Sequence, residues 1–262
     1  MHCARVLAFF CLTVFAQLAV AGGAADRQVF STDWERGIPG NLSVQSASRD
    51  DLDVSNDPAD PSRQALRASI GVGENYSGVA NGAPRAEVAF LGALRFAAGH
   101  EYLVRWSTFI PASYGADDDE SVVVTQIHQG DCCSGPPPVM LTIRGMHYEF
   151  AVRGGPGKAR EQRLSAIDAD IGRWTTWQLR YRPDPSGGRA RTELSKNGAV
   201  VFTAPGAANA WPDGQTSYLK MGLYKTRWVP KPGRPKRITL FYGPVSITET
   251  ASGAHADRKR ER

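Results

Sequence analysis

Three short runs of β-forming residues carry polar side chains that can hold an anion and move a proton. They are Arg85 and Glu87, then Gln126 and His128, and finally Tyr218, Lys220 and Tyr224. A guanidinium, an amide and an ammonium all donate hydrogen bonds to a carboxylate. An imidazole with an ordinary pKa near about 6.5 and a phenol with one near about 10 serve as general acids and bases. These residue types therefore allow acid–base chemistry beside a bound anion.

Each run places its polar residues on one face if it forms a β-strand, because strand side chains alternate faces with a period of two. The expected polar faces are Arg85 and Glu87; Val122, Val124, Gln126 and His128; and Tyr218, Lys220, Gly222 and Tyr224. The expected apolar faces are Ala86, Val88 and Phe90; Val123, Thr125 and Ile127; and Leu219, Met221 and Leu223.

Each polar set also has a purely structural explanation. Arg85 and Glu87 would form an ion pair of little energetic value on a solvated face. Gln126 and His128 would end an ordinary polar strand, and tyrosines are common in strands. Gly222 indicates close approach of a ligand or of another backbone. The presence of all three sets in one chain favours a shared site.

The rest of the chain has the pattern of an all-β domain. The 262 residues are 42% hydrophobic and 22% charged, with a formal charge of +5, which excludes wholesale disorder, collagen and coiled coil. Asn197-Gly198 predicts a two-residue hairpin turn, and a short helix is expected near residues 165–171. The expected strands are 87–91, 102–110, 121–128, 139–143, 147–153, 175–182, 191–196, 200–203, 218–224 and 238–248.

The two ends of the chain differ from this pattern. Residues 1–21 combine Arg5, an apolar run over residues 6–20 and the small-residue site Ala19-Val20-Ala21, which is typical of a secretory signal peptide. A membrane anchor is the alternative, but the run is shorter than the roughly 20 apolar residues that a span needs. We expect an exported, periplasmic or extracellular protein with one domain over residues 22–250 and a charged, disordered tail over residues 251–262.

Removal of the signal peptide leaves two cysteines, Cys132 and Cys133. Adjacent cysteines close no chain loop and add little stability through loop entropy. A vicinal disulfide, pairing between chains and buried thiols all remain open. Neither cysteine has the spacing of a zinc site.

The order R-x-E, Q-I-H and Y-x-K-x-G-x-Y, at Arg85–Glu87, Gln126–His128 and Tyr218–Tyr224, resembles the polysaccharide lyases with a β-jelly-roll fold. These are the alginate-lyase-like, glucuronan-lyase-like and heparin-lyase-I-like enzymes, and the resemblance covers roughly residues 30–248. It implies an all-β, concanavalin A-like jelly-roll sandwich with a substrate groove on the concave sheet. We also expect a monomer that needs no metal or cofactor for its chemistry.

The resemblance implies cleavage of a uronic-acid polymer by β-elimination. Arg85 and Gln126 would neutralise the uronate carboxylate, and Tyr224 would act as acid and also as base, with His128 as base or as a carboxylate neutraliser. Substrate binding is expected of Glu87, Arg144, Tyr218, Lys220 and Lys225. The polymer would be glucuronan, alginate or heparin-like. Alginate-specific enzymes tend to show R-[ST]-E-[LV]-R, from which Arg85-Ala86-Glu87-Val88-Ala89 departs.

Several surface features have two readings each. The basic stretch Lys225, Arg227, Lys231, Arg234, Lys236 and Arg237 is either a wall that attracts a polyanion or a solvated loop. Residues 117–120, three aspartates and a glutamate, form either a calcium site or a solvated acidic loop. Trp211 and Trp228 either stack on sugar rings or belong to the core.

Other function classes fit the sequence less well. A retaining glycoside hydrolase on a similar sandwich needs two carboxylates about 5–5.5 Å apart, and its usual E-x-D-x-x-E run does not occur. A lectin-like carbohydrate-binding module is the main alternative, and it would not require His128 and Tyr224 in the groove. Export and the absence of a recognition motif oppose a nucleic-acid partner.

Overall fold

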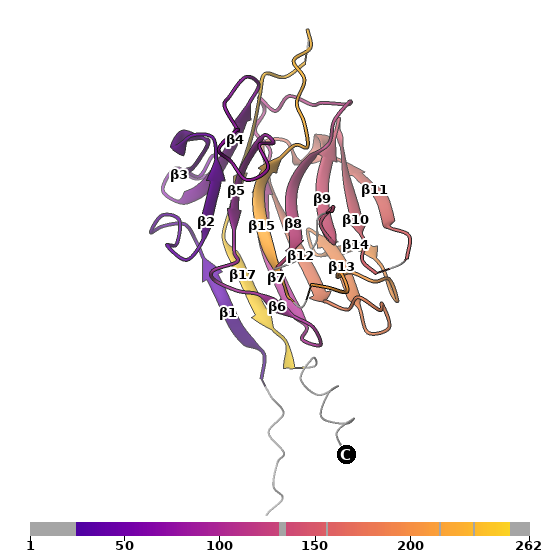
Figure 1. The fold of residues 1–262 in the computed structure, drawn as a ribbon. Coiled ribbons are helices and arrows are strands. Elements are labelled where there is room, and N and C mark those ends of the chain that lie inside the picture. Colours follow the sequence, from indigo (N-terminus) through magenta and orange to yellow (C-terminus); the bar gives the residue numbers. More distant parts are fainter. Residues whose placement is uncertain (1–24, 131–134, 156, 215, 233, 252–262) are drawn as a thin grey trace, which may run out of the picture.

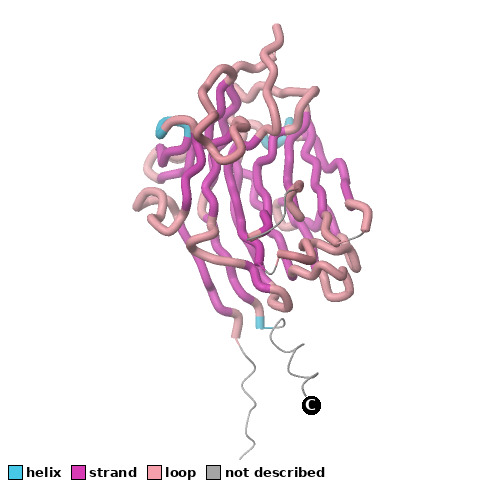
Figure 2. Tube along the Cα trace, viewed as in Figure 1, coloured by secondary structure: helices cyan, strands magenta, loops and turns pink. Residues whose placement is uncertain are grey.

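The computed structural model of this chain describes residues 25–130, 135–155, 157–214, 216–232 and 234–251. The predicted signal peptide, Cys132 and Cys133, and residues 252–262 of the predicted tail lie outside the described residues. Strands dominate the trace in Figure 2, and the named helical elements are the 3₁₀ turns η1 (Arg49–Asp51) and η2 (Asp168–Asp170). Within the described part, no helix is long and apolar enough to cross a membrane.

Two antiparallel sheets pack face to face (Figure 1). The first sheet has eight strands in the order β11-β10-β9-β8-β15-β5-β2, with β6 beside β15. Its strands are β2 (Ser43–Ser46), β5 (Arg85–Ala89), β6 (Phe96–Ala97), β8 (Val122–Gln129), β9 (Val139–Arg144), β10 (His147–Val152), β11 (Arg160–Ala166) and β15 (Thr216–Tyr224).

The second sheet has nine strands and covers the back of the first. Its main path is β14-β13-β12-β7-β16-β4-β3, and β17 and β1 branch from β7. Its strands are β1 (Arg27–Thr32), β3 (Leu52–Asn56), β4 (Gln64–Gly71), β7 (Tyr102–Phe109), β12 (Trp174–Arg182), β13 (Arg191–Lys196), β14 (Ala199–Thr203), β16 (Arg237–Tyr242) and β17 (Val245–Glu249). This arrangement confirms the predicted jelly-roll sandwich.

The core lies between the two sheets and is built by alternation along the strands. Leu219, Met221 and Leu223 of β15 are at most 1% exposed, and they pack in the same cluster as Leu240 and Tyr242 of β16. Burial of such apolar side chains is the main driving force for packing the sheets together. The other face of β15, with its polar residues, is thereby turned away from this core and toward a groove.

Strand pairing brings the three predicted motifs side by side. On one edge of β15, Tyr224 pairs with Arg85 and Gly222 pairs with Glu87. On its other edge, Tyr218 pairs with His128 and Lys220 pairs with Gln126. Strands that are far apart in the sequence therefore form one polar surface on the first sheet.

A β-bulge in β8 corrects the predicted faces of that strand. The register against β9 shifts between Val123 and Thr125, so one residue of β8 is extra. Val122 and Val124 are therefore buried in the core with Ile127, whereas Val123 lines the groove beside Gln126 and His128. The prediction that Val122 and Val124 share a face with Gln126 and His128 is wrong, because strict alternation does not continue through a bulge.

Two glycine predictions are confirmed. Gly222 has φ = +134°, and a side-chain carbon there would clash with the carbonyl oxygen of Ala86. Of the two explanations for Gly222, close approach of another backbone is the one observed. Asn197 and Gly198 have φ of +50° and +83° and join β13 to β14, as a type I′ hairpin turn requires.

Two of the predicted elements have a different form in the structure. The strand expected over 238–248 is divided into β16 and β17 at Gly243-Pro244, because proline cannot donate to a ladder and Gly243 N instead bonds the Ser107 carbonyl. The helix expected near 165–171 is the end of β11 followed by the single turn η2. Strands β1 to β4, β6 and β11 were not expected from the pattern.

Candidate active site

A groove of about 520 Å³ crosses the polar surface of the first sheet. Six of the predicted site residues line it, namely Arg85, Gln126, His128, Tyr218, Lys220 and Tyr224. The remaining walls come from neighbouring strands and loops, through Gln45, Ala80, Asn81, Ser121, Val123, Gly135, Pro136, Pro137, Met140, Thr142 and Thr226. The three motifs thus form one site rather than three separate polar faces.

Glu87 lies beneath the groove and connects three of its residues. Its carboxylate accepts hydrogen bonds from Gln126 Nε2 at 2.5 Å, Lys220 Nζ at 2.6 Å and Arg85 Nη1 at 3.3 Å. Glu87 is only 1% exposed and does not line the groove. The prediction that Glu87 touches the substrate is replaced by a supporting position behind the residues that do line the groove.

The charges of this cluster do not cancel. Arg85 and Lys220 are both buried and share one carboxylate, so the formal sum over Arg85, Lys220 and Glu87 is positive by one charge. Burial lowers the pKa of Lys220, the carboxylate of Glu87 opposes this, and the charge of Arg85 adds to the lowering. A single bound anion would therefore balance the site and relieve the repulsion between the two cations.

Arg85 is held in a fixed orientation beside Tyr224. Its Nη2 donates to Asn81 Oδ1 at 2.7 Å, and its Nη1 donates to Gln45 Oε1 at 3.1 Å. The Cζ atom of Arg85 lies 4.4 Å from the centroid of the Tyr224 ring, in cation–π contact. The guanidinium and the phenol are therefore placed together by β5, β15 and two further acceptors.

A hydrogen bond fixes which ring nitrogen of His128 carries the proton in the neutral imidazole. Its Nδ1 lies 2.9 Å from the carbonyl oxygen of Gln129, and because a carbonyl only accepts, Nδ1 carries the proton. Nε2 is then an acceptor. Burial lowers the pKa of His128, the bond to the Gln129 carbonyl opposes this, and the charge of Lys220 adds to the lowering. The histidine beside the groove is therefore able to accept a proton at neutral pH.

Two buried polar atoms of the groove residues have no hydrogen-bond partner among the described residues. They are Arg85 Nε, a donor, and Gln126 Oε1, an acceptor. Buried polar groups are normally satisfied, so such atoms indicate where a ligand or water completes the network. Gln126 differs from the sequence expectation, because its amide nitrogen is already engaged by Glu87.

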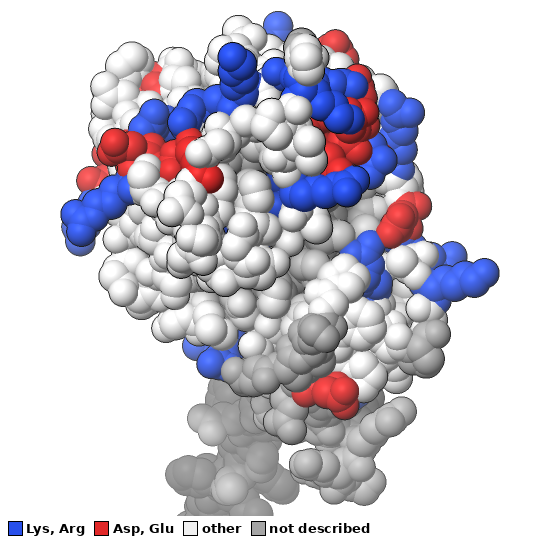
Figure 3. Space-filling model, turned by 45° about the horizontal axis from the view of Figure 1, so that its top comes forward, with Lys and Arg blue, Asp and Glu red and all other residues white. Residues whose placement is uncertain are grey.

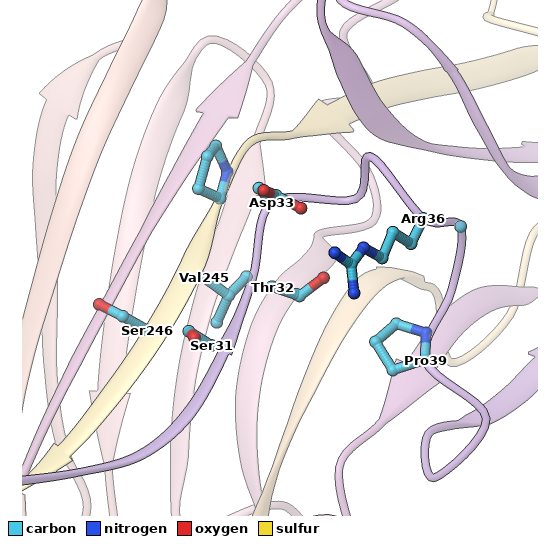
Figure 4. Close-up of a pocket in the computed structure, with 9 residues that line it drawn as sticks. Ser31, Thr32, Asp33, Arg36, Pro39, Val245 and Ser246 are labelled. Atoms are coloured by element: carbon cyan, nitrogen blue, oxygen red, sulfur yellow. The ribbon is translucent and has the colours of Figure 1, made fainter.

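A second hollow on the molecule lacks these groups. Figure 4 shows it at the β1–β17 edge, where the Arg36 side chain points toward Thr32 and Pro39. Its lining contains one arginine and one aspartate but no histidine or tyrosine. This hollow therefore lacks the histidine and the tyrosines that line the groove of the first sheet.

Comparisons with known proteins agree with this geometry. The model of the family described as "Polysaccharide lyase" matches residues 32–246. The chain belongs to this family of polysaccharide lyases. No curated protein sequence matches the lyase, so the remaining comparisons concern solved structures.

The solved structures show the same fold at low sequence identity. An endo-β-1,4-glucuronan lyase from the fungus Trichoderma reesei has a TM-score of 0.60 and 14% identity, covering 85% of this chain and 91% of its own. The family 7 alginate lyase A1-II′ in complex with substrate has a TM-score of 0.55 and 12% identity, covering 80% and 92%. An alginate lyase from Pseudomonas aeruginosa has a TM-score of 0.50 and 17% identity, covering 71% and 83%.

Two predicted substrate-binding residues of the lyase lie elsewhere. Lys225 is fully buried, and its Nζ donates to Asp117 Oδ2 at 2.7 Å and to the Glu120 carbonyl at 3.1 Å. The prediction that Lys225 faces the groove is wrong, because it continues the inward side of β15 after Leu223. Arg144 lies in an adjoining hollow that shares Ser121, Met140 and Thr142 with the groove, 3.6 Å from Glu149.

The acidic loop 117–120 and the basic stretch after β15 neutralise each other. Figure 3 shows lysine or arginine and aspartate or glutamate side chains interleaved on this end of the lyase. The ion pairs are Lys225–Asp117, Arg227–Glu120, Lys231–Asp119 and Arg234 with both Asp118 and Asp119. A continuous basic wall is therefore not formed by these residues. Among the described residues, no group of three or more histidine, cysteine or acidic side chains could hold a metal ion.

Trp211 and Trp228, which were considered for stacking on sugar rings, both contact other residues of the lyase. Trp228 packs against the core, with Lys225 Nζ 5.1 Å from its ring centroid, and Trp211 Nε1 donates to the Pro136 carbonyl. The sequence interpretation missed Gln45 and Asn81, which orient Arg85. Both stand in polar segments without a periodic signal. Only the pairing of β2 with β5 brings Gln45 to Arg85, and Asn81 reaches Arg85 from the loop before β5.

Proposed function

We propose that this polysaccharide lyase cleaves a uronic-acid-containing polysaccharide by β-elimination in the groove of the first sheet. The observation that carries the proposal is the positively charged Arg85–Glu87–Lys220 cluster beside a neutral His128 and Tyr224. A cationic cluster with a surplus of one charge suits one uronate carboxylate. The two titratable side chains beside it suit removal and delivery of a proton.

Carboxylate binding is the first requirement of the reaction. The proton on C5 of a uronate is weakly acidic, and its removal sends charge into the C6 carboxylate. Arg85 and Lys220 both line the groove and place their positive charges beside that carboxylate. Donors already oriented before the charge develops stabilise the transition state strongly. Gln126 also lines the groove, and its amide is held in place by Glu87.

Proton transfer is the second requirement. A base takes the C5 proton, the electron pair forms a C4=C5 double bond, and the C4–O4 bond breaks. An acid then protonates the departing O4, so that atoms and charges balance without water being consumed. Tyr224 serves as the acid, and either Tyr224 or His128 Nε2 serves as the base, depending on which face of the sugar carries the C5 hydrogen.

Glucuronan, alginate and heparin-like polymers are the candidate substrates. The structural similarity to a glucuronan lyase supports the first, and the similarity to alginate lyases supports the second. The Arg85-Ala86-Glu87-Val88-Ala89 sequence departs from the alginate pattern, so glucuronan is the first polymer to test. The sequence of residues 1–21 supports export of the lyase to the periplasm or the medium.

The test is a substrate screen with the purified mature protein. Glucuronan, alginate, heparin, heparan sulfate, hyaluronan and pectate are each incubated with the lyase, and the ultraviolet absorbance of the unsaturated uronate is followed. The products should be lighter than hydrolysis products by one water molecule, since elimination consumes no water. Products that have gained water would indicate a hydrolase, and binding without any product would indicate a lectin-like protein. We also propose that the chemistry needs no metal, so EDTA should leave the rate unchanged.

A further inference from the structure

Lys225 occupies a fully enclosed position directly after Tyr224. Its ammonium is bonded to the Asp117 carboxylate and to the Glu120 carbonyl, and it faces the ring of Trp228. Lys225 has no exposed surface, and the Asp117 side chain is 8% exposed. A buried lysine is tolerated only when its charge is paired and hydrogen-bonded, and both conditions hold here.

The same residue joins the starting points of the other two site strands. The backbone N–H of Lys225 donates to the Pro84 carbonyl at 2.9 Å, and Pro84 immediately precedes Arg85. Asp117 and Glu120 belong to the loop that leads into β8, which carries Gln126 and His128. The Asp117 carbonyl also accepts from Gly145 N at 2.9 Å, in the turn between β9 and β10. Lys225 therefore links the ends of β15, β5 and β8 at one point.

The other ion pairs between these two loops have a different character. Side-chain exposure is 75% and 28% in Arg227–Glu120, and 53% and 40% in Lys231–Asp119. Water and salt screen such pairs, and they contribute little. Burial works to raise the pKa of Asp117, but the hydrogen bond and charge of Lys225 outweigh it, so this pKa lies below its ordinary value. Of these three pairs, only Lys225–Asp117 is enclosed.

We propose that Lys225, through its enclosed pair with Asp117, is a positioning residue that fixes the Tyr224 phenol against Arg85 for the elimination. The inference rests on the proposed function, since it assigns a role in that reaction. Lys225 touches no substrate and acts only through the backbone of Tyr224, of Pro84 and of the loop before β8. A shift of about 1 Å in a reacting group lowers a rate by as much as about a hundredfold, so such a clamp affects turnover more than binding.

The test compares three variants by kcat, KM and thermal midpoint. Lys225→Met should lower kcat on the order of ten- to a hundredfold, with KM changed by less than about threefold. It also leaves the Asp117 carboxylate buried without its partner, so its midpoint should fall. Lys231→Met is the matched control in the same two loops. This control removes an exposed pair and should keep both the wild-type kcat and the wild-type midpoint.

The double variant Asp117→Asn/Lys225→Met separates positioning from stability. Removal of both charges eliminates the unpaired carboxylate, so the double variant should be more stable than Lys225→Met while its kcat stays low. A wild-type kcat in the folded double variant would overturn the inference and leave Lys225 as a purely stabilising residue. A raised KM with normal kcat would overturn it in favour of substrate binding. A wild-type protein without activity on any polymer would instead overturn the proposed function.

Discussion

Tyr224 of β15 lies directly opposite Arg85 of β5, and the Arg85 guanidinium carbon stands 4.4 Å from the centre of the phenol ring. The pairing holds because Gly222, two residues earlier, allows the two backbones to approach closely. The same guanidinium is tied to Asn81, Gln45 and Glu87. The proposed acid and the proposed carboxylate binder are therefore set against each other by strand pairing.

Removal of the Tyr224 hydroxyl should abolish most of the activity. In Tyr224→Phe the ring and its contact with Arg85 remain, but the proton donor is lost, so kcat should fall by roughly 10²–10⁴-fold with little change in KM. Tyr102→Phe is the control, because its hydroxyl accepts a bond from Ala97 N, away from the groove lining. Steady-state kinetics on the polymer that the lyase cleaves fastest measure kcat and KM of both variants. Tyr224→Phe with the wild-type rate would remove Tyr224 from the mechanism.

The acid limb of the pH–rate profile should lie below the ordinary histidine value. Burial and the charge of Lys220 lower the pKa of His128, so its neutral form persists to lower pH than about 6.5. With His128 as base, kcat/KM rises with pH through that lowered pKa. Lys220→Met removes a nearby positive charge, and the limb should then move to higher pH. If the acid limb does not move in Lys220→Met, it reports the titration of a group other than His128.

Loss of the Glu87 charge should harm both folding and turnover. Glu87→Gln keeps the shape but leaves the buried Arg85 and Lys220 without their shared carboxylate. Breaking a buried ion pair by removing one partner costs on the order of 3–5 kcal/mol. Urea unfolding measures this cost. The double variant Glu87→Gln/Lys220→Met removes one of the two unpaired cations, so it should recover part of the lost free energy of unfolding. Unchanged stability of Glu87→Gln would contradict the supporting role of Glu87.

Alanine at Gly222 should be far more harmful than alanine at Gly198. Both glycines have positive φ, but a side-chain carbon at Gly222 meets the Ala86 carbonyl, whereas nothing lies within 4 Å at Gly198. Gly198→Ala should cost about 1 kcal/mol from backbone strain alone. Gly222→Ala should cost more and should also lower kcat, because β5 must move away from Tyr224. Equal unfolding free energies for the two variants would contradict this account of Gly222.

The sequence was sufficient for the fold class and for six of the residues that line the groove. Alternation along 218–224 placed Tyr218, Lys220 and Tyr224 on one face, and β15 keeps its register against β5 from Lys220 to Tyr224. The same argument failed in β8, since a bulge depends on neighbouring strands rather than on local pattern. Gln45 and Asn81 could not be found, because their importance arises only from contact with Arg85.

The wrong expectation that Lys225 binds substrate has a different cause. Alternation itself places it on the inward side with Leu223, and the acidic loop 117–120 offered a partner. The positive charge suggested a polyanion because the net charge of the segment was considered without its fold. Acidic and basic segments that lie far apart in the sequence neutralise each other across the end of the groove, and only the topology brings them together.

The most direct test of the account is the ultraviolet absorbance of the lyase acting on glucuronan and the other uronate polymers, beside Tyr224→Phe and His128→Ala. The account predicts a steady increase for the wild-type protein on at least one polymer. It also predicts an increase that is strongly reduced in Tyr224→Phe and lowered in His128→Ala. No increase on any polymer, or the wild-type rate in both variants, would contradict β-elimination at this site.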